Sequence, residues 1–139
     1  MTPADIGAPS AAAPEDAAQY AAAPHVPLRK PLERICVKSV NRIVIVPTTD
    51  ISRLEAEDNY VRIWADRPYL HKDTLTHLLA ALDPATFVRI HRSHAVNVRC
   101  VRELRPQLHG EYVIIMVDGT AVTSGRSYRH HIQQAFGLE

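Results

Sequence analysis

The twelve residues from Phe87 to Val98 concentrate the side chains of this chain that are best suited to binding an anion or a base edge. Apolar residues such as Val88 and Ile90 supply a frame for long hydrogen-bonding side chains. Those polar side chains belong to Arg89, His91, Arg92, Ser93 and Asn97. Arginine can donate two hydrogen bonds to guanine, asparagine can bond adenine in the same way, and arginine and serine also hold phosphates. The stretch therefore predicts a site that binds nucleic acid.

The charge distribution supports this interpretation. The formal net charge is only +1, yet residues 89–105 hold five arginines against a single acid, Glu103. Residues 50–58 form an acidic cluster with Asp50, Glu55, Glu57 and Asp58. A dipolar chain of this kind can steer a basic stretch toward a polyanion without being basic overall. The alternative is a solvated face whose charges pair internally.

The sequence gives little support for an enzyme or for a metal-binding protein. The sequence contains no GxSxG, P-loop or HExxH pattern, so we do not expect an enzyme. His91 and His94, or His130 and His131, are candidate ligands for a metal or haem, but an HxxH pair alone is a weak signal. We expect no cofactor, and a haem or metal sensor that uses His91 and His94 remains an alternative hypothesis.

The cysteines, the N-terminal sequence and the lengths of the apolar stretches indicate the expected cellular compartment. Cys36 and Cys100 belong to no CxxC pair, which argues against a structural zinc site. The N-terminus lacks the basic and apolar regions of a signal peptide, and no stretch is long enough for a membrane span. We therefore expect a cytoplasmic protein with no membrane partner.

The elements that must position these residues are mainly β. Residues 1–34 contain six of the ten prolines and ten alanines, which predicts a disordered or linker tail, and residues 35–139 form the expected domain. Short β-branched runs predict seven to ten strands, beginning with a hairpin over residues 35–46. Leu75, Leu78, Leu79 and Leu82 share one helical stripe, with Asp73 as the expected N-cap. Ser127 is expected to cap a second helix, which ends at Gly137.

The predicted nucleic acid is double-stranded DNA. Proteins that bind RNA or single strands stack bases on exposed aromatic side chains. Aromatic residues make up only 6% of this chain, and most of them occupy apolar positions. Duplex DNA instead suits polar side chains carried on loops at one edge of a sheet, and residues 87–98 together with Arg126 and Arg129 could supply them.

Residues 87–98 resemble the signature FxRxHRSxxVN of the LytTR DNA-binding domain. Further blocks are similar to this family in order and spacing, so the resemblance runs from about residue 35 to 137. These blocks are residues 50–61, 73–75, 101–104, 118–119 and 123–128. The resemblance implies a small multi-sheet β domain with two short helices. It also implies that loops, rather than a recognition helix, enter successive major grooves and that the DNA bends.

Site residues follow from the resemblance by position. It implies that Arg92, Arg126 and the turn from Asn59 to Arg62 lie near the bases. Lys72, Arg89, His91 and Ser93 are implied either to contact phosphates or to shape those loops. Asn97 and Arg89 have a structural alternative, which is to stabilise strand ends, and His91 has one as a loop-setting histidine. The closing segment departs from the family in one respect, because Gly125 separates Ser124 from Arg126.

The expected function is that of a sequence-specific bacterial transcription regulator related to two-component systems. Its expected partners are promoter repeats in duplex DNA, a second copy on that DNA, and a separate sensor or regulator protein, because the tail is too short for a receiver domain. The alternative from another class is a protein-interaction module that keeps the fold without binding DNA.

Overall fold

The computed structural model describes residues 30–138 of the chain. Most of the expected tail therefore lies outside the described residues. The described part is built mainly from short strands, as the β-branched runs predict. The strands are β1 (Arg34–Ser39), β2 (Arg42–Pro47), β3 (Arg53–Glu57), β4 (Tyr60–Trp64), β5 (Pro68–Lys72), β6 (Phe87–His91), β7 (His94–Asn97), β8 (Val101–Pro106), β9 (Tyr112–Met116) and β10 (Ala121–Thr123). The helices are α1 (Leu75–Ala81) and α2 (Arg129–Phe136), with 3-10 turns η2 (Thr48–Asp50), η3 (Val98–Cys100) and η4 (Arg126–Tyr128).

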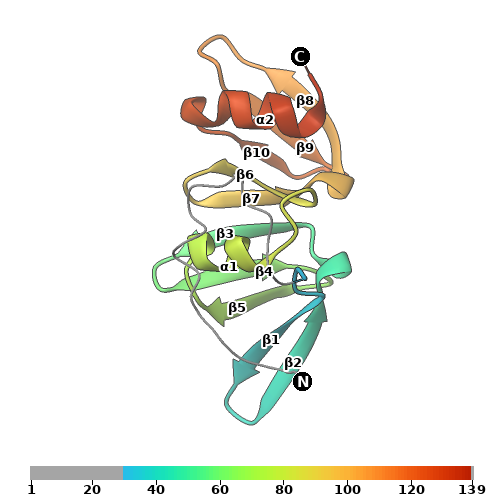
Figure 1. Cartoon of the computed structure of the whole chain (residues 1–139), viewed down its shortest axis with the longest axis vertical. Helices are drawn as coiled ribbons and strands as arrows, with labels where there is room; N and C mark the ends of the chain where they lie inside the picture. Colours follow the sequence, from blue (N-terminus) through green and yellow to red (C-terminus); the bar gives the residue numbers. More distant parts are fainter. Residues whose placement is uncertain (1–29, 139) are drawn as a thin grey trace. The chain divides into compact units, whose positions relative to one another are not determined.

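The strands form three antiparallel sheets (Figure 1). β1 and β2 pair as the predicted hairpin, and β10, β9 and β8 form a three-stranded sheet. The middle sheet has five strands in the order β5-β4-β3-β7-β6. The mainly β, multi-sheet fold with two short helices expected from the sequence is confirmed.

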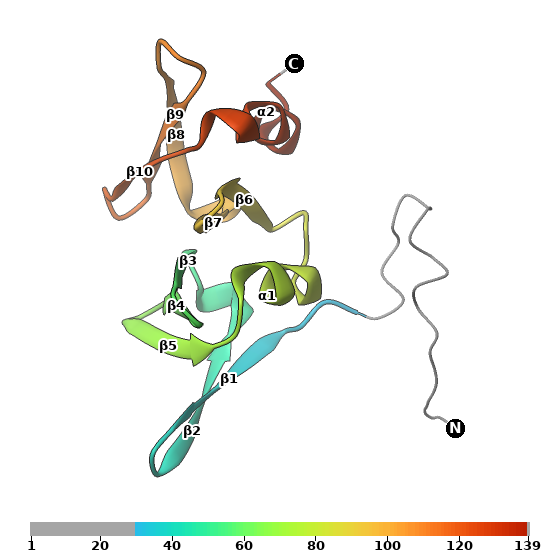
Figure 2. The ribbon, with the colours of Figure 1, turned by 90° about the vertical axis from the view of Figure 1, so that its left-hand side faces the viewer.

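The five-stranded sheet has a core on each face, because successive side chains of a strand point to opposite sides. Leu54 and Ala95 face the core that is shared with α1 and the β1–β2 hairpin. Val96 and Ile90 face the second core, which includes Ile132 of α2 and residues of the three-stranded sheet. Figure 2 shows α1 beside the five-stranded sheet and α2 beside the three-stranded sheet. Between them the two cores fix the frame from which the turns project.

Two expected helix caps are wrong, and each has a physical reason. Thr74, not Asp73, caps α1, because its hydroxyl accepts the His77 amide at 3.1 Å. Asp73 is engaged elsewhere: its Oδ1 accepts the Thr74 amide at 2.8 Å and lies 2.9 Å from the His77 ring.

The second wrong cap is at α2. The chain enters α2 through η4, so the cap position falls on Tyr128 rather than Ser127, with no side-chain cap. Gly137 ends α2 in the left-handed conformation with φ +67°, as the sequence predicts. No helix within residues 30–138 is long and apolar enough to cross a membrane.

Candidate nucleic-acid interface

One end of the five-stranded sheet gathers the turns that carry the predicted site residues. The β3–β4 turn holds Asn59, with Asp58 in the left-handed region at φ +56°. Lys72 ends β5 at this position, because it pairs with Tyr60 and the following amide of Asp73 donates to the Asn59 carbonyl at 3.2 Å. We call this the turn end of the sheet.

The β6–β7 turn, residues 92–93, lies at the same turn end, and we call it the signature turn. The Ala56 amide of β3 donates to the Ser93 carbonyl at 2.8 Å, and His94 pairs with Glu55. The signature turn is thereby held beside the end of β3, next to the β3–β4 turn. Arg92 is exposed, and Ser93 is half-buried.

η4 (Arg126–Tyr128) lies beside the signature turn, and we call the β3–β4 turn, the signature turn and η4 together the row. The Gly125 amide donates to the Ile90 carbonyl at 2.9 Å, which holds the start of η4 against the last residues of β6. Arg126 follows immediately and is exposed. Figure 1 shows the β3–β4 turn, the signature turn and the start of α2 on the same side, at the left of the view. Arg92 and Arg126 therefore project from adjacent segments rather than from opposite sides.

Lys72, Arg92 and Arg126 are exposed on these segments, beside one exposed carboxylate, Asp58 of the β3–β4 turn. Among residues 30–138, no carboxylate lies within ion-pair distance of Lys72, Arg92 or Arg126. The acidic neighbours are mostly engaged: Glu57 pairs with Arg62, and Asp73 lies beside His71 and His77. The exposed guanidinium and ammonium groups are thus available to an external anion.

Arg89 is committed to holding the signature turn. Its Nε donates to the His91 carbonyl at 3.3 Å, and its NH2 group donates to the Arg92 carbonyl through a short hydrogen bond. Its NH1 group donates to the Thr76 hydroxyl of α1 at 2.8 Å. One guanidinium therefore ties the signature turn to the first turn of α1, and Arg89 acts as a positioning residue.

The His91 side chain also stabilises the signature turn by a hydrogen bond. Its Nδ1 accepts the Ser93 amide at 3.1 Å, so this nitrogen must carry no proton. The His94 ring lies next to it, with the two ring centroids 5.2 Å apart. Burial lowers the pKa of His94, whose Nδ1 is shielded from solvent and has no partner among the described residues. Within residues 30–138, no three His, Cys, Asp or Glu side chains converge as a metal site.

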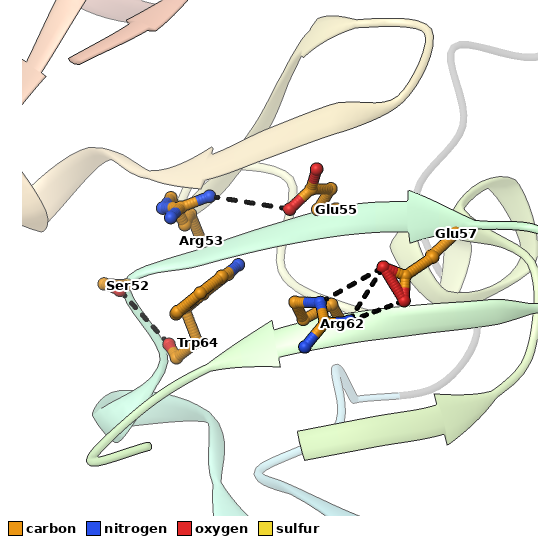
Figure 3. Close-up of polar contacts among 6 residues, drawn as sticks. All are labelled: Ser52, Arg53, Glu55, Glu57, Arg62 and Trp64. Atoms are coloured by element: carbon orange, nitrogen blue, oxygen red, sulfur yellow. Dashed lines mark hydrogen bonds and ion pairs between the residues drawn. The ribbon is translucent and has the colours of Figure 1, made fainter. Parts of the chain in front are cut away.

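The face of the sheet next to these turns carries a layer of paired charges (Figure 3). Arg62 donates to Glu57 through its Nε and NH2 groups, including an NH2–Oε1 contact of 2.6 Å. The Arg53 guanidinium lies 4.2 Å from the centre of the Trp64 ring and 3.9 Å from Glu55. These pairs hold their charges along β3 and β4, so Arg62 belongs to the strand face and not to the tip of the turn.

Comparison with known protein families identifies the family of this domain. The model of the LytTr DNA-binding domain matches residues 41–137, which is most of the chain. This chain belongs to the LytTR DNA-binding domain family. The matched LytTR domain is a DNA-binding domain rather than an enzyme, as the sequence led us to expect.

Two individual proteins are similar to this chain in sequence. The LytTR domain is 34% identical to the sensory transduction protein LytT of Bacillus subtilis (strain 168) over 93 residues, covering 66% of this chain and 39% of LytT. It is 31% identical to the transcriptional regulatory protein YpdB of Escherichia coli (strain K12) over 78 residues, covering 55% of this chain and 32% of YpdB. The chain thus spans about two fifths of the length of LytT.

A solved structure extends the agreement to the fold. It is the LytTr DNA-binding domain of a methyl-accepting/DNA response regulator from Bacillus cereus. Its TM-score is 0.70 with 26% sequence identity, and the match covers 76% of this chain and 98% of that one. The three-sheet architecture described above is therefore that of a LytTR domain.

The LytTR domain brings most of the predicted site residues together. Those at the turn end are Asn59, Lys72, Arg89, His91, Arg92, Ser93 and Arg126. Asn97 lies at the other end of β7, buried, where its Nδ2 donates to the Ile51 carbonyl at 2.8 Å and its Oδ1 accepts the Arg99 amide at 3.0 Å. Asn97 therefore takes the structural role that was its alternative.

Sequence reasoning missed two partners in the LytTR domain. Thr76 anchors Arg89, although no motif marks a threonine in the first turn of a helix as a partner for a strand residue 13 positions away. Trp64 stacks with Arg53 across two strands. The alternation of Arg53 in β3 and Trp64 in β4 could have indicated a shared face, but only once the pairing of these strands was known.

Proposed function

We propose that this LytTR domain binds duplex DNA in a sequence-specific manner through its turn end and thereby regulates transcription in the cytoplasm. One observation carries the proposal: the hydrogen bond from Gly125 to Ile90 sets Arg126 beside the hairpin that presents Arg92. Two exposed guanidinium groups on adjacent segments can reach a common polyanion. Phosphate contacts would supply most of the affinity, and base contacts the discrimination.

The order of the segments suggests how they meet a duplex. The signature turn lies between the β3–β4 turn and η4. We assign the outer segments, with Asn59 and Arg126, to successive major grooves, and Arg92 to the minor groove between them. Arginine is favoured where a minor groove is narrow, because the negative potential is strongest there. Lys72 lies beyond the β3–β4 turn and suits a phosphate contact.

Simple dimensions argue that the bound DNA bends. Adjacent strands lie about 4.8 Å apart, so the β3–β4 turn and the signature turn are two strand spacings, about 10 Å, apart. η4, which carries Arg126, is hydrogen-bonded to β6 and lies directly beyond the signature turn, so the two outer segments are also close together. Successive major grooves on one side of straight B-DNA lie about 34 Å apart. A turn end of this size reaches both grooves only if the duplex curves toward it. Fluorescence transfer between dyes at the two ends of a duplex would detect this bend.

Selection from random duplexes tests the proposal most simply. We expect the full chain to enrich one motif. We also expect it to bend a duplex that carries this motif and to stay bound to that duplex in competition with unrelated DNA. A pool with no enriched motif would favour a protein-interaction module on this fold instead. On a duplex with two copies of the motif, we propose that two chains bind adjacent repeats, which sedimentation of the complex would measure. Input from a separate sensor or regulator protein is part of the same proposal.

A further inference from the structure

A fourth segment continues the row beyond η4. The β8–β9 turn, residues 107–110, follows the last pair of its ladder, Pro106 with Tyr112. Tyr112 is joined to Ser124 by two hydrogen bonds of 2.9 Å, one from each residue's amide. Since Ser124 leads directly into Gly125 and η4, the β8–β9 turn lies at the same end of the molecule as Arg126. Figure 1 shows this turn at the upper left, above the start of α2.

Arg129 joins the β8–β9 turn to this row. It is the first residue of α2, it is exposed, and its Cδ lies 3.8 Å from the position that a Cβ on Gly110 would occupy. The aliphatic part of the side chain thus lies over the turn. No carboxylate of residues 30–138 is within ion-pair distance of its guanidinium.

The surroundings of Arg129 favour an anion. Arg126 lies three residues before it, and the exposed His109 lies in the turn beside it. Glu111 follows the β8–β9 turn, and one of its carboxylate oxygens is shielded from solvent with no hydrogen-bond partner among the described residues. This tip therefore carries two exposed guanidinium groups, those of Arg126 and Arg129, and the aliphatic stem of Arg129 packs against Gly110.

We propose that Arg129 and the β8–β9 turn bind the phosphate backbone flanking the groove that receives Arg126. This inference rests on the proposed function, because it extends the same interface at the end opposite Lys72. Arg129 contacts phosphate and not a base edge, so its contribution is independent of sequence. The footprint of the protein on DNA accordingly extends past the bases that Arg126 contacts.

The test compares single variants of the full chain on two duplexes, the selected motif and an unrelated sequence, over a range of salt concentrations. We expect Arg129→Ala to weaken binding to both duplexes by a similar factor, about fivefold at about 0.1 M salt. We expect it also to lower the slope of log affinity against log salt by about 0.9. Arg129→Gln keeps the aliphatic stem over Gly110 and should behave in the same way, whereas Arg129→Lys should retain most of the affinity.

Arg99 offers a matched control. It is an exposed arginine of η3, which follows β7 at the end of the sheet away from the signature turn. Arg99→Ala removes the same charge and should leave both affinities and the salt slope unchanged. Equal affinity and slope for Arg129→Ala, Arg129→Gln and the parent would overturn the inference, as would a loss limited to the selected motif. If Arg126→Ala instead leaves motif binding intact, or the parent shows no preference, the proposed function itself fails.

Discussion

Arg89→Lys separates a positioning role from direct contact with DNA. Lysine keeps the charge, and it binds phosphates well as a point charge, but it cannot reproduce the planar set of donors that Arg89 uses. The three hydrogen bonds reach two carbonyls of the signature turn region and the Thr76 hydroxyl. Lysine can keep one of them, so about two are lost.

The expected magnitude follows from those two bonds. A hydrogen bond to a charged group contributes about 1.5–3 kcal/mol when buried, and the half-buried position of Arg89 places each of these bonds below that range. We expect Arg89→Lys to lower the free energy of unfolding by about 2 kcal/mol, or Tm by about 10 °C for a domain of this size. Motif binding should weaken by about tenfold or more, because the signature turn is no longer held in one geometry.

Urea denaturation and DNA titration at several salt concentrations provide the assay. The salt slope of Arg89→Lys should equal that of the parent, since no phosphate contact is lost. Thr76→Val removes the hydroxyl that accepts from Arg89 and should produce a smaller loss in the same direction. The reasoning is refuted if Arg89→Lys keeps both the stability and the motif affinity of the parent, which is the behaviour of a simple phosphate contact.

Three further predictions concern single side chains. Asn97→Ala should lower the free energy of unfolding in urea by about 1–3 kcal/mol, because it leaves the Ile51 carbonyl and the Arg99 amide unpaired. The salt slope of DNA binding should stay constant. Unchanged stability would contradict the structural role of Asn97. Burial lowers the pKa of His94 below 6.5, so the unfolded chain binds this proton more readily. Stability should therefore be full above about pH 7 and fall as the pH drops through 6.5, and His94→Gln should flatten that fall. Arg92→Ala and Arg126→Ala should each weaken motif binding by about tenfold without lowering Tm, as measured by titration and thermal unfolding; motif affinities equal to that of the parent would remove both residues from the interface.

The sequence predicts the local elements of this fold well. The β1–β2 hairpin follows from β-branched runs around Asn41, and α1 follows from leucines at helical spacing, because both signals depend on neighbouring residues. The pairing of β3 with β7 does not follow, since it joins segments about 40 residues apart through backbone groups that every sequence has. The cap of α1 was misplaced by one residue for a related reason: Asp73 and Thr74 both suit the position, and the His77 ring decides between them.

The sequence marks the residues that the structure brings to the turn end, but it does not predict which partners their side chains take. The signature residues share polar chemistry, so the sequence cannot distinguish a guanidinium that faces DNA from one that holds a turn. Arg89 donates to Thr76, a residue of α1 that lies 13 positions away in the sequence, and Arg62 is held on the strand face by Glu57. Arg92 and Arg126 have no such partner among the described residues and stay exposed. Tertiary partners, rather than residue type, separate the two groups.

The central claim is that the turn end binds the duplex, and amide chemical-shift mapping of the full chain tests it directly. On adding the selected duplex, we expect the largest shifts at residues 58–59, 92–93 and 125–129. Residues 98–100 and the β9–β10 turn at the other end of the sheets should shift little. Large shifts at that other end, with the signature turn and η4 unperturbed, would contradict the account.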